Sequence, residues 1–455
     1  MLKSLKKLVA CPLFFASVAT GASVVSLVSG YAFAQDNHID QIRSDAPELA
    51  AYGKYPIGVV SVTAINPGQL DILKAKLGES TPVYDRSLTL EIWYPAAFKE
   101  SQKPLLSQYK TFLRDGKTQV ALTGRASRNA APDKQAGPYP LIIVSHGYPG
   151  NRFLLSHLTE NLASKGYVVV AIDHTESTYD DMKGFSSTLL NRSLDQLFVL
   201  REMARLNQLD TSILKNLVDV DHTGLIGYSM GGYGAINTIG GGLTAKSVDA
   251  PFVANRALAI RQAGNPDYMA SMDTRIKAAV AFAPWGWNAG LWDSAGLAAI
   301  KTPVFFVAGS VDDVSGYSPG VRNIFDASVN APRYLLTFEN ANHNAGAPMP
   351  APREAWQVLP GTKRSQAEHY IDAVWDTTRM NNISQHFVTA FFGKYLKQQS
   401  DVDAYLDLVE TSKDGKWDVD TNGVPKAGHS YWKGFAARSA VGLKLEKRNP
   451  ASEVK

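Results

Sequence analysis

A single serine, Ser229, stands in the run Gly227-Tyr-Ser-Met-Gly231, which places a nucleophilic hydroxyl among glycines. The short, mostly apolar run 222–226 precedes it, and the small-faced segment 230–239 follows with the character of a helix start. A strand, Gly-x-Ser-x-Gly and a helix form the context of a nucleophile elbow, where the serine sits on a strained turn between small neighbours. The glycines let the backbone bend sharply and let a substrate approach, so we predict Ser229 as the nucleophile.

A serine nucleophile needs a base, and an acid must orient that base. Where the serine lies on a nucleophile elbow, the acid and then the histidine follow it along the chain. Among nine histidines, His343 follows a late apolar run and lies in the Gly/Asn-rich loop ENANHNAG, so it is the predicted base. For the acid, the run VFFVAGSVDDVSG offers Asp312 and Asp313 after a strand, and its Gly-x-x-Asp spacing favours Asp312. Asp173 and Glu339 also end strands, and we assign them structural roles.

An oxyanion hole requires two backbone N–H groups, one after the nucleophile and one from the loop after an early strand. The first is that of Met230. The second is expected in SHGYPGNR (145–152), where Gly147 permits a tight turn and Tyr148 presents its N–H. The Tyr148 side chain is an open candidate for the acyl pocket.

Other polar residues receive structural interpretations. His369 and His386 fall in a C-terminal helical pattern and are expected to be surface or packing residues. Arg192 and Asp195 share a helical turn and are predicted to form a structural pair. The run 418–423 is similar to the start of a calcium loop, but His429 occupies its twelfth position, where an acid is required, so we predict no metal.

The elements that would position these residues alternate between strands and helices. Continuous apolar strands separated by helices predict a mostly parallel central sheet with helices on both faces, an α/β fold. The expected strands are 58–62, 88–94, 141–145, 167–173, 222–226, 278–283, 304–308 and 334–338, and the expected helices are 153–165, 192–209 and 367–396.

Two segments lie outside this alternation. Residues 241–274 form a long connection after the elbow helix and are predicted to make a partial cover over the site. Residues 400–455 are weakly patterned and are assigned to a C-terminal extension. The predicted organisation is therefore a signal peptide at 1–34, a catalytic domain at 35–399 and this extension.

The signal peptide assignment rests on a basic start, an apolar middle and the run Ala32-Phe33-Ala34. Cleavage after Ala34 removes three lysines, so the formal charge falls from +4 to +1, and it removes the only cysteine, Cys11. The prediction is a secreted or periplasmic bacterial protein of about 420 residues without disulfides. Near-neutral charge gives no case for nucleic-acid binding, and no later apolar run is long enough for membrane insertion. The sequence leaves the oligomeric state open.

With these motifs in place, the chain resembles the α/β-hydrolase superfamily. Within it, residues 56–395 look like bacterial enzymes related to platelet-activating-factor acetylhydrolase, called predicted dienelactone hydrolases, with cutinase-like polyester hydrolases as relatives. The segments that carry the likeness are RSLTLEIWYPA, SHGYPGNR, DHTES, NRSLDQLFVL, GYSMGG and RIKAAVAFAPWGW.

The resemblance implies a serine hydrolase of carboxylic esters that needs no cofactor. It matches Ser229, Asp312 and His343 to the triad, Tyr148 and Met230 to the oxyanion donors, and Trp285 to a tryptophan that flanks the substrate. Trp287 and Trp292 are expected to be core or loop aromatics. Two departures are evident: true dienelactone hydrolases use a cysteine nucleophile, and the polyester enzymes are much shorter, so the extra segments here could close their open cleft.

The sequence therefore predicts an esterase acting through an acyl-enzyme on Ser229, with short-chain, lipid-like or polyester substrates, small or polymeric. Two alternatives stay open. One is an amidase or peptidase that uses the same triad, and the other is a non-catalytic binding protein on a hydrolase fold.

Overall fold

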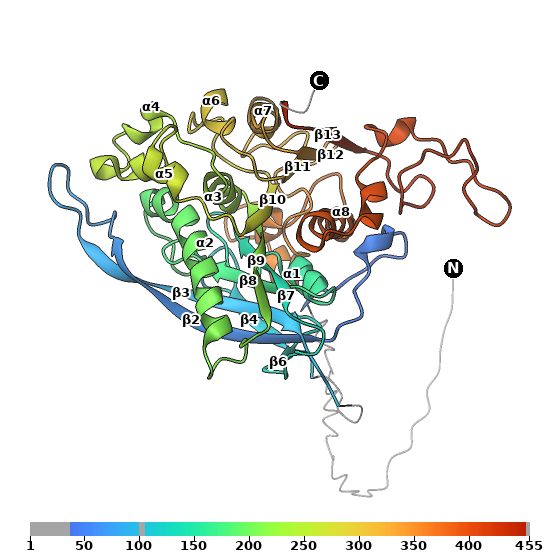
Figure 1. Cartoon of the computed structure of the whole chain (residues 1–455), viewed down its shortest axis with the longest axis horizontal. Coiled ribbons are helices and arrows are strands. Elements are labelled where there is room, and N and C mark those ends of the chain that lie inside the picture. Colours follow the sequence, from blue (N-terminus) through green and yellow to red (C-terminus); the bar gives the residue numbers. More distant parts are fainter. Residues whose placement is uncertain (1–36, 100–104, 452–455) are drawn as a thin grey trace, which may run out of the picture. The chain divides into compact units, whose positions relative to one another are not determined.

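The computed structural model describes residues 37–99 and 105–451, and the predicted signal peptide at 1–34 lies outside them. A ten-stranded mixed sheet dominates the molecule (Figure 1), in the order β13-β12-β11-β10-β9-β7-β8-β3-β2-β6. The strands are β2 (Ile57–Leu70), β3 (Val83–Pro95), β6 (Ser127–Arg128), β7 (Tyr139–Ser145), β8 (Val168–Asp173), β9 (Val218–Tyr228), β10 (Ile276–Phe282), β11 (Val304–Gly309), β12 (Arg333–Phe338) and β13 (Leu443–Arg448).

The centre of the sheet is parallel. Strands β8, β7, β9, β10, β11 and β12 run in one direction, β3 is antiparallel to β8, and β13 is antiparallel to β12. Because parallel strands need crossovers, helices must lie on the sheet's faces. The mostly parallel sheet confirms the predicted α/β-hydrolase fold. All the expected strands are present, and several are longer than the sequence suggested.

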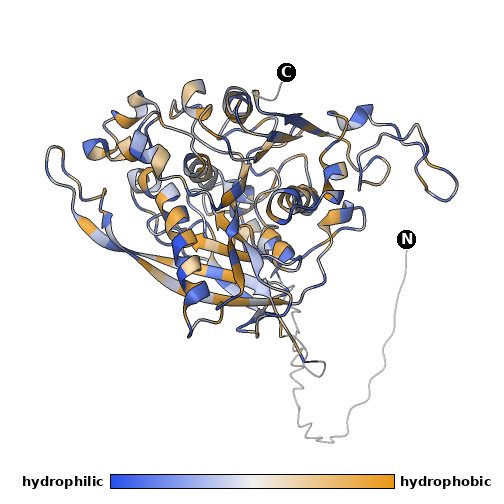
Figure 2. Cartoon of the chain, in the orientation of Figure 1, coloured by the Kyte–Doolittle hydropathy of each residue, from blue (hydrophilic) through white to orange (hydrophobic). Residues whose placement is uncertain are grey.

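Alternate residues of each strand enter two separate cores. On β7, Ile142 and Val144 belong to one core, whereas Leu141 and Ile143 belong to the other. The first core lies under α1 (Ser156–Ala163) and α8 (Thr377–Lys397), and the second lies under α2 (Phe185–Gln208), α3 (Met230–Thr238) and α7 (Arg322–Ala327). Polar and apolar residues alternate along α2 (Figure 2), as expected for a helix that covers a sheet.

The predicted helix 367–396 is wrong in its first part. Residues 366–369 form only a 3-10 turn, and α8 begins after Asp376, whose side chain accepts a hydrogen bond from the N–H of Arg379. This carboxylate satisfies one of the free N–H groups of the first turn and so fixes the start of the helix. Residues 366–369, which precede this helix, lie instead in the wall of the functional site described below.

The described part of the connection between β3 and β7, residues 105–139, is more than a loop. It contains β4 (Gln108–Phe112) and β5 (Gln119–Thr123), which form a small sheet with β1 (Asn37–His38), in addition to β6. Tyr109 of β4 is fully buried, and its ring packs on Phe153 and Trp93. The small sheet is therefore joined to the main core.

The described part of the predicted extension, residues 400–451, packs into the main fold. Its strand β13 pairs with β12 over six residues, and Trp432 and Phe435 pack on Phe387 of α8. Buried Glu446 of β13 is ion-paired with Arg322 and Lys444, which neutralises its charge. The tail therefore completes one edge of the sheet.

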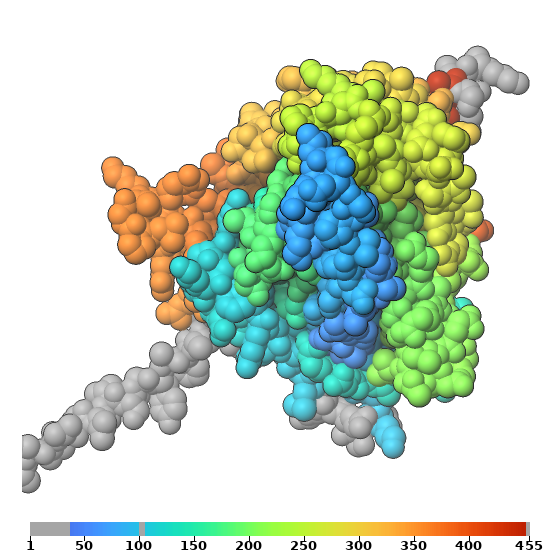
Figure 3. All heavy atoms as spheres, turned by 90° about the vertical axis from the view of Figure 1, so that its left-hand side faces the viewer, coloured from blue at the N-terminus to red at the C-terminus, as the bar shows by residue number. Residues whose placement is uncertain are grey.

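The insertion 241–274 contains α4 (Ala245–Val248), a 3-10 segment at 254–261 and α5 (Pro266–Ala270), and α6 (Ser294–Leu297) lies beyond β10. The side chain of Asn255 bonds to Lys76, Glu79 and Thr81 and to the N–H of Gly78, at the tip of the β2–β3 ribbon. Figure 3 shows this tip, in blue, lying against the yellow-green insertion. The insertion thus supports the ribbon, on the side of the sheet covered by α2.

Candidate active site

Ser229 occupies the turn between β9 and α3. Its φ of 54° and ψ of −113° lie in a region that non-glycine residues rarely adopt. A Cβ on Gly227 would lie 2.2 Å from the carbonyl oxygen of Gly231. A Cβ on Gly231 would lie 2.0 Å from the carbonyl oxygen of Ser145. Only glycine fits at these two positions, so the Gly-x-Ser-x-Gly pattern is a steric requirement of the turn.

Three segments bring Ser229, His343 and Asp312 together. His343 Nε2 lies 3.0 Å from Ser229 Oγ, and His343 Nδ1 lies 3.0 Å from each carboxylate oxygen of Asp312. Asp312 follows β11 and His343 follows β12, so both reach the serine from the carboxyl ends of neighbouring strands. Asp312 contacts the imidazole, whereas Asp313 lines the cavity described below.

Asp312 is held as a carboxylate. Burial acts to raise its pKa, but hydrogen bonds from His343 and from the backbone N–H groups of Val314 and Ser315 outweigh burial, so the pKa lies below its ordinary value. An ionised acid beside Nδ1 keeps the proton on that nitrogen and leaves Nε2 free to accept one from Ser229. The arrangement can activate a hydroxyl.

Tyr148 and Met230 present two backbone N–H groups near the serine. Neither N–H donates a hydrogen bond to another group within the described residues. A Cβ added to Gly147 would lie 3.4 Å from the Cβ of Ser229, so the loop after β7 closely approaches the nucleophile. Two free donors beside a nucleophile suit an oxyanion.

A cavity of about 580 Å³ opens at Ser229 and His343. Most of its other lining residues are polar in type, although apolar atoms supply somewhat more of the exposed wall. These residues come from 114–115, from parts of 359–369 and from Tyr148, Tyr228, Val314, Asn342 and Asn344. The predicted cover, 241–274, does not line it. That insertion is instead bound to α2 and α3, through Arg261 to Ser193 and through Tyr268 to the Asn237 carbonyl.

Sequence reasoning misplaced His369 in a helix. The 3-10 turn puts it in the cavity wall, where Nε2 lies 2.7 Å from the Tyr179 hydroxyl and Nδ1 lies 2.6 Å from Arg114 Nη1. Burial lowers the pKa of His369 to about 3, so its ring is neutral. By contrast, His386 packs in the interior and accepts the N–H of Leu49, and Asp173 binds Arg152, as expected of structural residues.

Trp285 lies beside the nucleophile without lining the cavity. Its backbone N–H donates a hydrogen bond to the Ser229 carbonyl over 3.3 Å. Its ring packs edge-on against the ring of Phe185, with the ring centroids 5.5 Å apart. Phe185 in turn contacts the ring of Tyr148, whose hydroxyl donates to the Lys183 carbonyl. Sequence reasoning missed Phe185, the first residue of α2, because its role depends on where that helix begins.

The other tryptophans and the acidic loop have structural surroundings. Trp292 is buried and donates to Asn237, while Trp287 packs at the edge of the core. Asp420 accepts the N–H groups of Asn422 and Val424, which closes a turn. Across the described residues, no group of three or more His, Cys, Asp or Glu side chains is placed to hold a metal, and no helix is long and apolar enough to cross a membrane.

The fold and this site define an α/β-hydrolase, and comparisons with known proteins give its relatives. The family model described as PET hydrolase-like matches residues 126–263. Cutinase est1 of Thermobifida alba is 26% identical over 215 residues, which are 47% of this chain and 56% of that protein. Cutinase cut1 of Thermobifida fusca is 22% identical over 213 residues, 47% of this chain and 52% of that protein.

A ferulic acid esterase structure from Streptomyces cinnamoneus superposes with a TM-score of 0.51 at 19% identity, covering 78% of this chain and 94% of that one. At this identity the likeness concerns the fold. The chain spans little more than half the length of the cutinases it matches. It is an α/β-hydrolase related to cutinase-like polyester hydrolases, as the sequence motifs predicted; the narrower likeness to platelet-activating-factor acetylhydrolase stays a prediction.

Proposed function

We propose that this protein is a serine hydrolase that cleaves carboxylic esters. The observation that carries the proposal is the chain of contacts Ser229–His343–Asp312 at the floor of a 580 Å³ cavity. The relationship to cutinases supports the choice of an ester as substrate.

The reaction follows from these contacts. Ser229 Oγ attacks the ester carbonyl while His343 Nε2 takes its proton, and the N–H groups of Tyr148 and Met230 bind the resulting oxyanion. Collapse of the tetrahedral intermediate breaks the ester C–O bond, and His343 returns the proton to the leaving alcohol. Water then attacks the acyl-enzyme by the same route, releasing the acid and Ser229. Asp312 remains ionised throughout and stabilises the imidazolium.

The cavity favours small esters with polar groups. Its volume lies within the range of sites for small ligands. The wall combines charged side chains such as Arg114 and Glu368, which can bind polar groups, with apolar surface that can contact a short acyl chain. We therefore place short-chain esters first, with lipid-like and polyester substrates after them. Residues 1–34 would direct the enzyme to the periplasm or the medium.

Hydrolysis of p-nitrophenyl acetate, butyrate and longer esters tests the proposal, with Ser229→Ala and His343→Ala beside the wild type. We expect turnover that falls with chain length and that both variants abolish. Mass spectrometry after treatment with a fluorophosphonate should find the label on Ser229. Wild-type rates no higher than those of the variants would overturn ester hydrolysis; parallel assays of anilides would then detect an amidase, and inactivity on both would favour a binding protein.

A further inference from the structure

Arg192 of α2 is buried directly behind the loop that carries the Tyr148 N–H. Its Nη1 donates to the His146 carbonyl and its Nη2 donates to the Gly147 carbonyl, both over 2.8 Å, while Nη2 also reaches Ser177 Oγ at 2.5 Å. Its side chain is 1% exposed, and within the described residues it forms no ion pair with a carboxylate. The predicted pair with Asp195 is therefore wrong, because Arg192 binds backbone carbonyls instead.

The Gly147 carbonyl belongs to the same peptide group as the Tyr148 N–H. A trans peptide is planar, and its C=O and N–H point in opposite directions. When Arg192 holds this carbonyl on the α2 side, the N–H must face away from α2. The ring of His146 adds a second bond: its Nε2 accepts the N–H of His174, so its Nδ1 carries the proton and donates to the Gly147 carbonyl over 2.7 Å.

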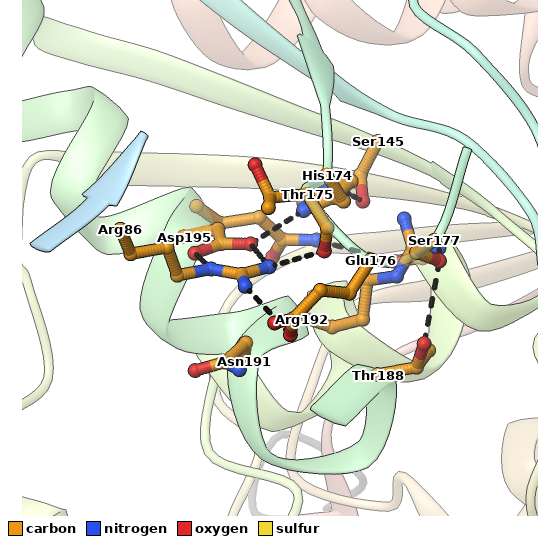
Figure 4. Close-up of polar contacts among 12 residues, drawn as sticks. Arg86, Ser145, His174, Thr175, Glu176, Ser177, Thr188, Asn191, Arg192 and Asp195 are labelled. Atoms are coloured by element: carbon orange, nitrogen blue, oxygen red, sulfur yellow. Dashed lines mark hydrogen bonds and ion pairs between the residues drawn. The ribbon is translucent and has the colours of Figure 1, made fainter. Parts of the chain in front are cut away.

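A buried array of charged groups lies behind Arg192 (Figure 4). Arg86 binds Asp195 through two hydrogen bonds of 2.9 and 3.0 Å, and Asp195 also accepts from His174 Nδ1 over 2.8 Å. Burial acts to raise the pKa of Asp195, but Arg86 and His174 outweigh it and lower the pKa to about 2. Asp195 is thus committed to partners other than Arg192.

This array contains a second serine–histidine–aspartate arrangement. His174 Nε2 lies 2.8 Å from Ser145 Oγ, on the opposite side of the ring from Asp195. Burial lowers the pKa of His174 to about 3, and all three side chains are at most 1% exposed, with no lining of the catalytic cavity. Since no substrate can reach it, this arrangement fixes the end of β7 and the loop that follows.

The helix α2 also holds the segment that carries the other oxyanion donor. Gln196 Nε2 donates to the Gly231 carbonyl over 3.2 Å, one residue after Met230. Residues four apart lie on the same face of a helix, so Arg192 and Gln196 face the same side. A Cβ on Gly234 would lie 2.9 Å from Arg192 Cβ, so the close approach of α2 to α3 requires that glycine.

We infer that Arg192 is a positioning residue for the oxyanion-binding backbone: by holding the His146 and Gly147 carbonyls, it turns the Tyr148 N–H toward the ester carbonyl. This rests on the proposed ester hydrolysis and adds a group that the serine, histidine and aspartate do not supply. The positive charge also polarises the Gly147–Tyr148 peptide, which strengthens its N–H as a donor where negative charge develops.

The test compares Arg192→Lys with a matched control, Arg261→Lys. Lysine keeps the charge but, as a compact point donor, cannot span two carbonyls as a guanidinium does. Arg261 is similarly buried and held by the hydroxyls of Ser193 and Ser271, away from the cavity. Each variant is assayed on p-nitrophenyl butyrate and on its thiono analogue, in which C=S replaces C=O, because sulfur is a weaker hydrogen-bond acceptor and depends less on the oxyanion donors.

We expect Arg192→Lys to lower kcat on the oxo ester by about 100-fold, the effect of losing one oxyanion donor, with KM changed by less than about threefold. The thiono ester should lose less, so the ratio of oxo to thiono rates should fall by about tenfold. Arg261→Lys should lower the melting temperature without changing kcat or this ratio.

An unchanged ratio in Arg192→Lys would overturn the inference, whether or not kcat falls, because a purely structural defect slows both esters alike. An equal fall of the ratio in Arg261→Lys would also overturn it. If Arg192→Lys does not fold, Ser177→Ala, which removes only one contact of the guanidinium, must shift the ratio in the same direction by a few-fold. Inactive wild type would instead reject ester hydrolysis itself, so the two failures are distinguishable.

Discussion

Replacing Asp312 with asparagine should nearly abolish turnover by forcing the wrong tautomer on His343. Asp312 Oδ1 accepts the N–H groups of Val314 and Ser315 over 2.9 and 2.8 Å. The asparagine carbonyl must take that place, which puts its NH₂ group where Oδ2 faces His343 Nδ1. Nδ1 lies 3.0 Å from both positions, and the NH₂ group opposes a proton on Nδ1 while the carbonyl is already shared by two backbone N–H groups. The variant therefore favours the tautomer of His343 with its proton on Nε2, which can no longer accept the proton of Ser229.

The expected loss in kcat is about 10⁴-fold, equivalent to about 5 kcal/mol of activation free energy. The melting temperature should change little, since both backbone N–H groups keep an acceptor. Initial rates on p-nitrophenyl butyrate measure the effect, and Asp313→Asn is the matched control. Asp313 lines the cavity and does not contact the imidazole, so its variant should stay within about threefold of wild type.

The reasoning is refuted if Asp312→Asn keeps a tenth or more of wild-type kcat, or if Asp313→Asn is the more damaged variant. A large loss of melting temperature in Asp312→Asn, with kcat recovering on cooling, would contradict the tautomer explanation in particular.

Three further perturbations follow from the packing. The ring nitrogens of His157 are buried without a hydrogen-bond partner in the described structure, and burial lowers the pKa of His157 to about 3. As the pH falls below about 6.5, this histidine binds a proton in the unfolded chain but not in the folded protein. The free energy of unfolding therefore decreases as the pH falls. His157→Phe should reduce that loss by about 1.4 kcal/mol per pH unit between about pH 6 and 4, and urea unfolding at several pH values giving the same slope as wild type would contradict this. Gly231→Ala should lower the free energy of unfolding by about 3 kcal/mol or more, as measured by thermal unfolding. Gly264→Ala is the control: no atom lies within 4 Å of the added Cβ, so the expected loss is about 1 kcal/mol. Equal losses would exclude the steric argument. Phe185→Leu removes two edge-on ring contacts and should lower stability by about 1–2 kcal/mol; an unchanged melting temperature would count against this packing.

The sequence allowed the central sheet and the three residues at the elbow and strand ends to be predicted, because both depend on local patterns. Buried parallel strands are continuous apolar runs, and residues after neighbouring strands meet at one edge. Ser229, Asp312 and His343 accordingly lie in contact. The roles assigned to them in turnover stay predictions.

The features that sequence reasoning missed depend on contacts between distant segments. The strand β13 reads LKLEKR, which looks solvated, yet Glu446 is buried because Arg322 and Lys444 reach it. The spacing of Arg192 and Asp195 correctly suggested one helical turn, but their partners come from β3 and the loops after β7 and β8. Helical spacing shows which side chains could meet on one helix, and it carries no information about the competing partners that the fold brings in.

The pairing of β12 with β13 bears on how the chain matures. β12 ends at Phe338 and its neighbour β13 begins only at Leu443, so β13 is synthesised after all the other described strands of the sheet. During synthesis β12 presents an open row of N–H and C=O groups to which other chains can pair. A nascent chain therefore cannot complete this sheet until residues 443–448 have left the ribosome. A chain cut off before Leu443 leaves this edge of β12 open and is therefore expected to aggregate.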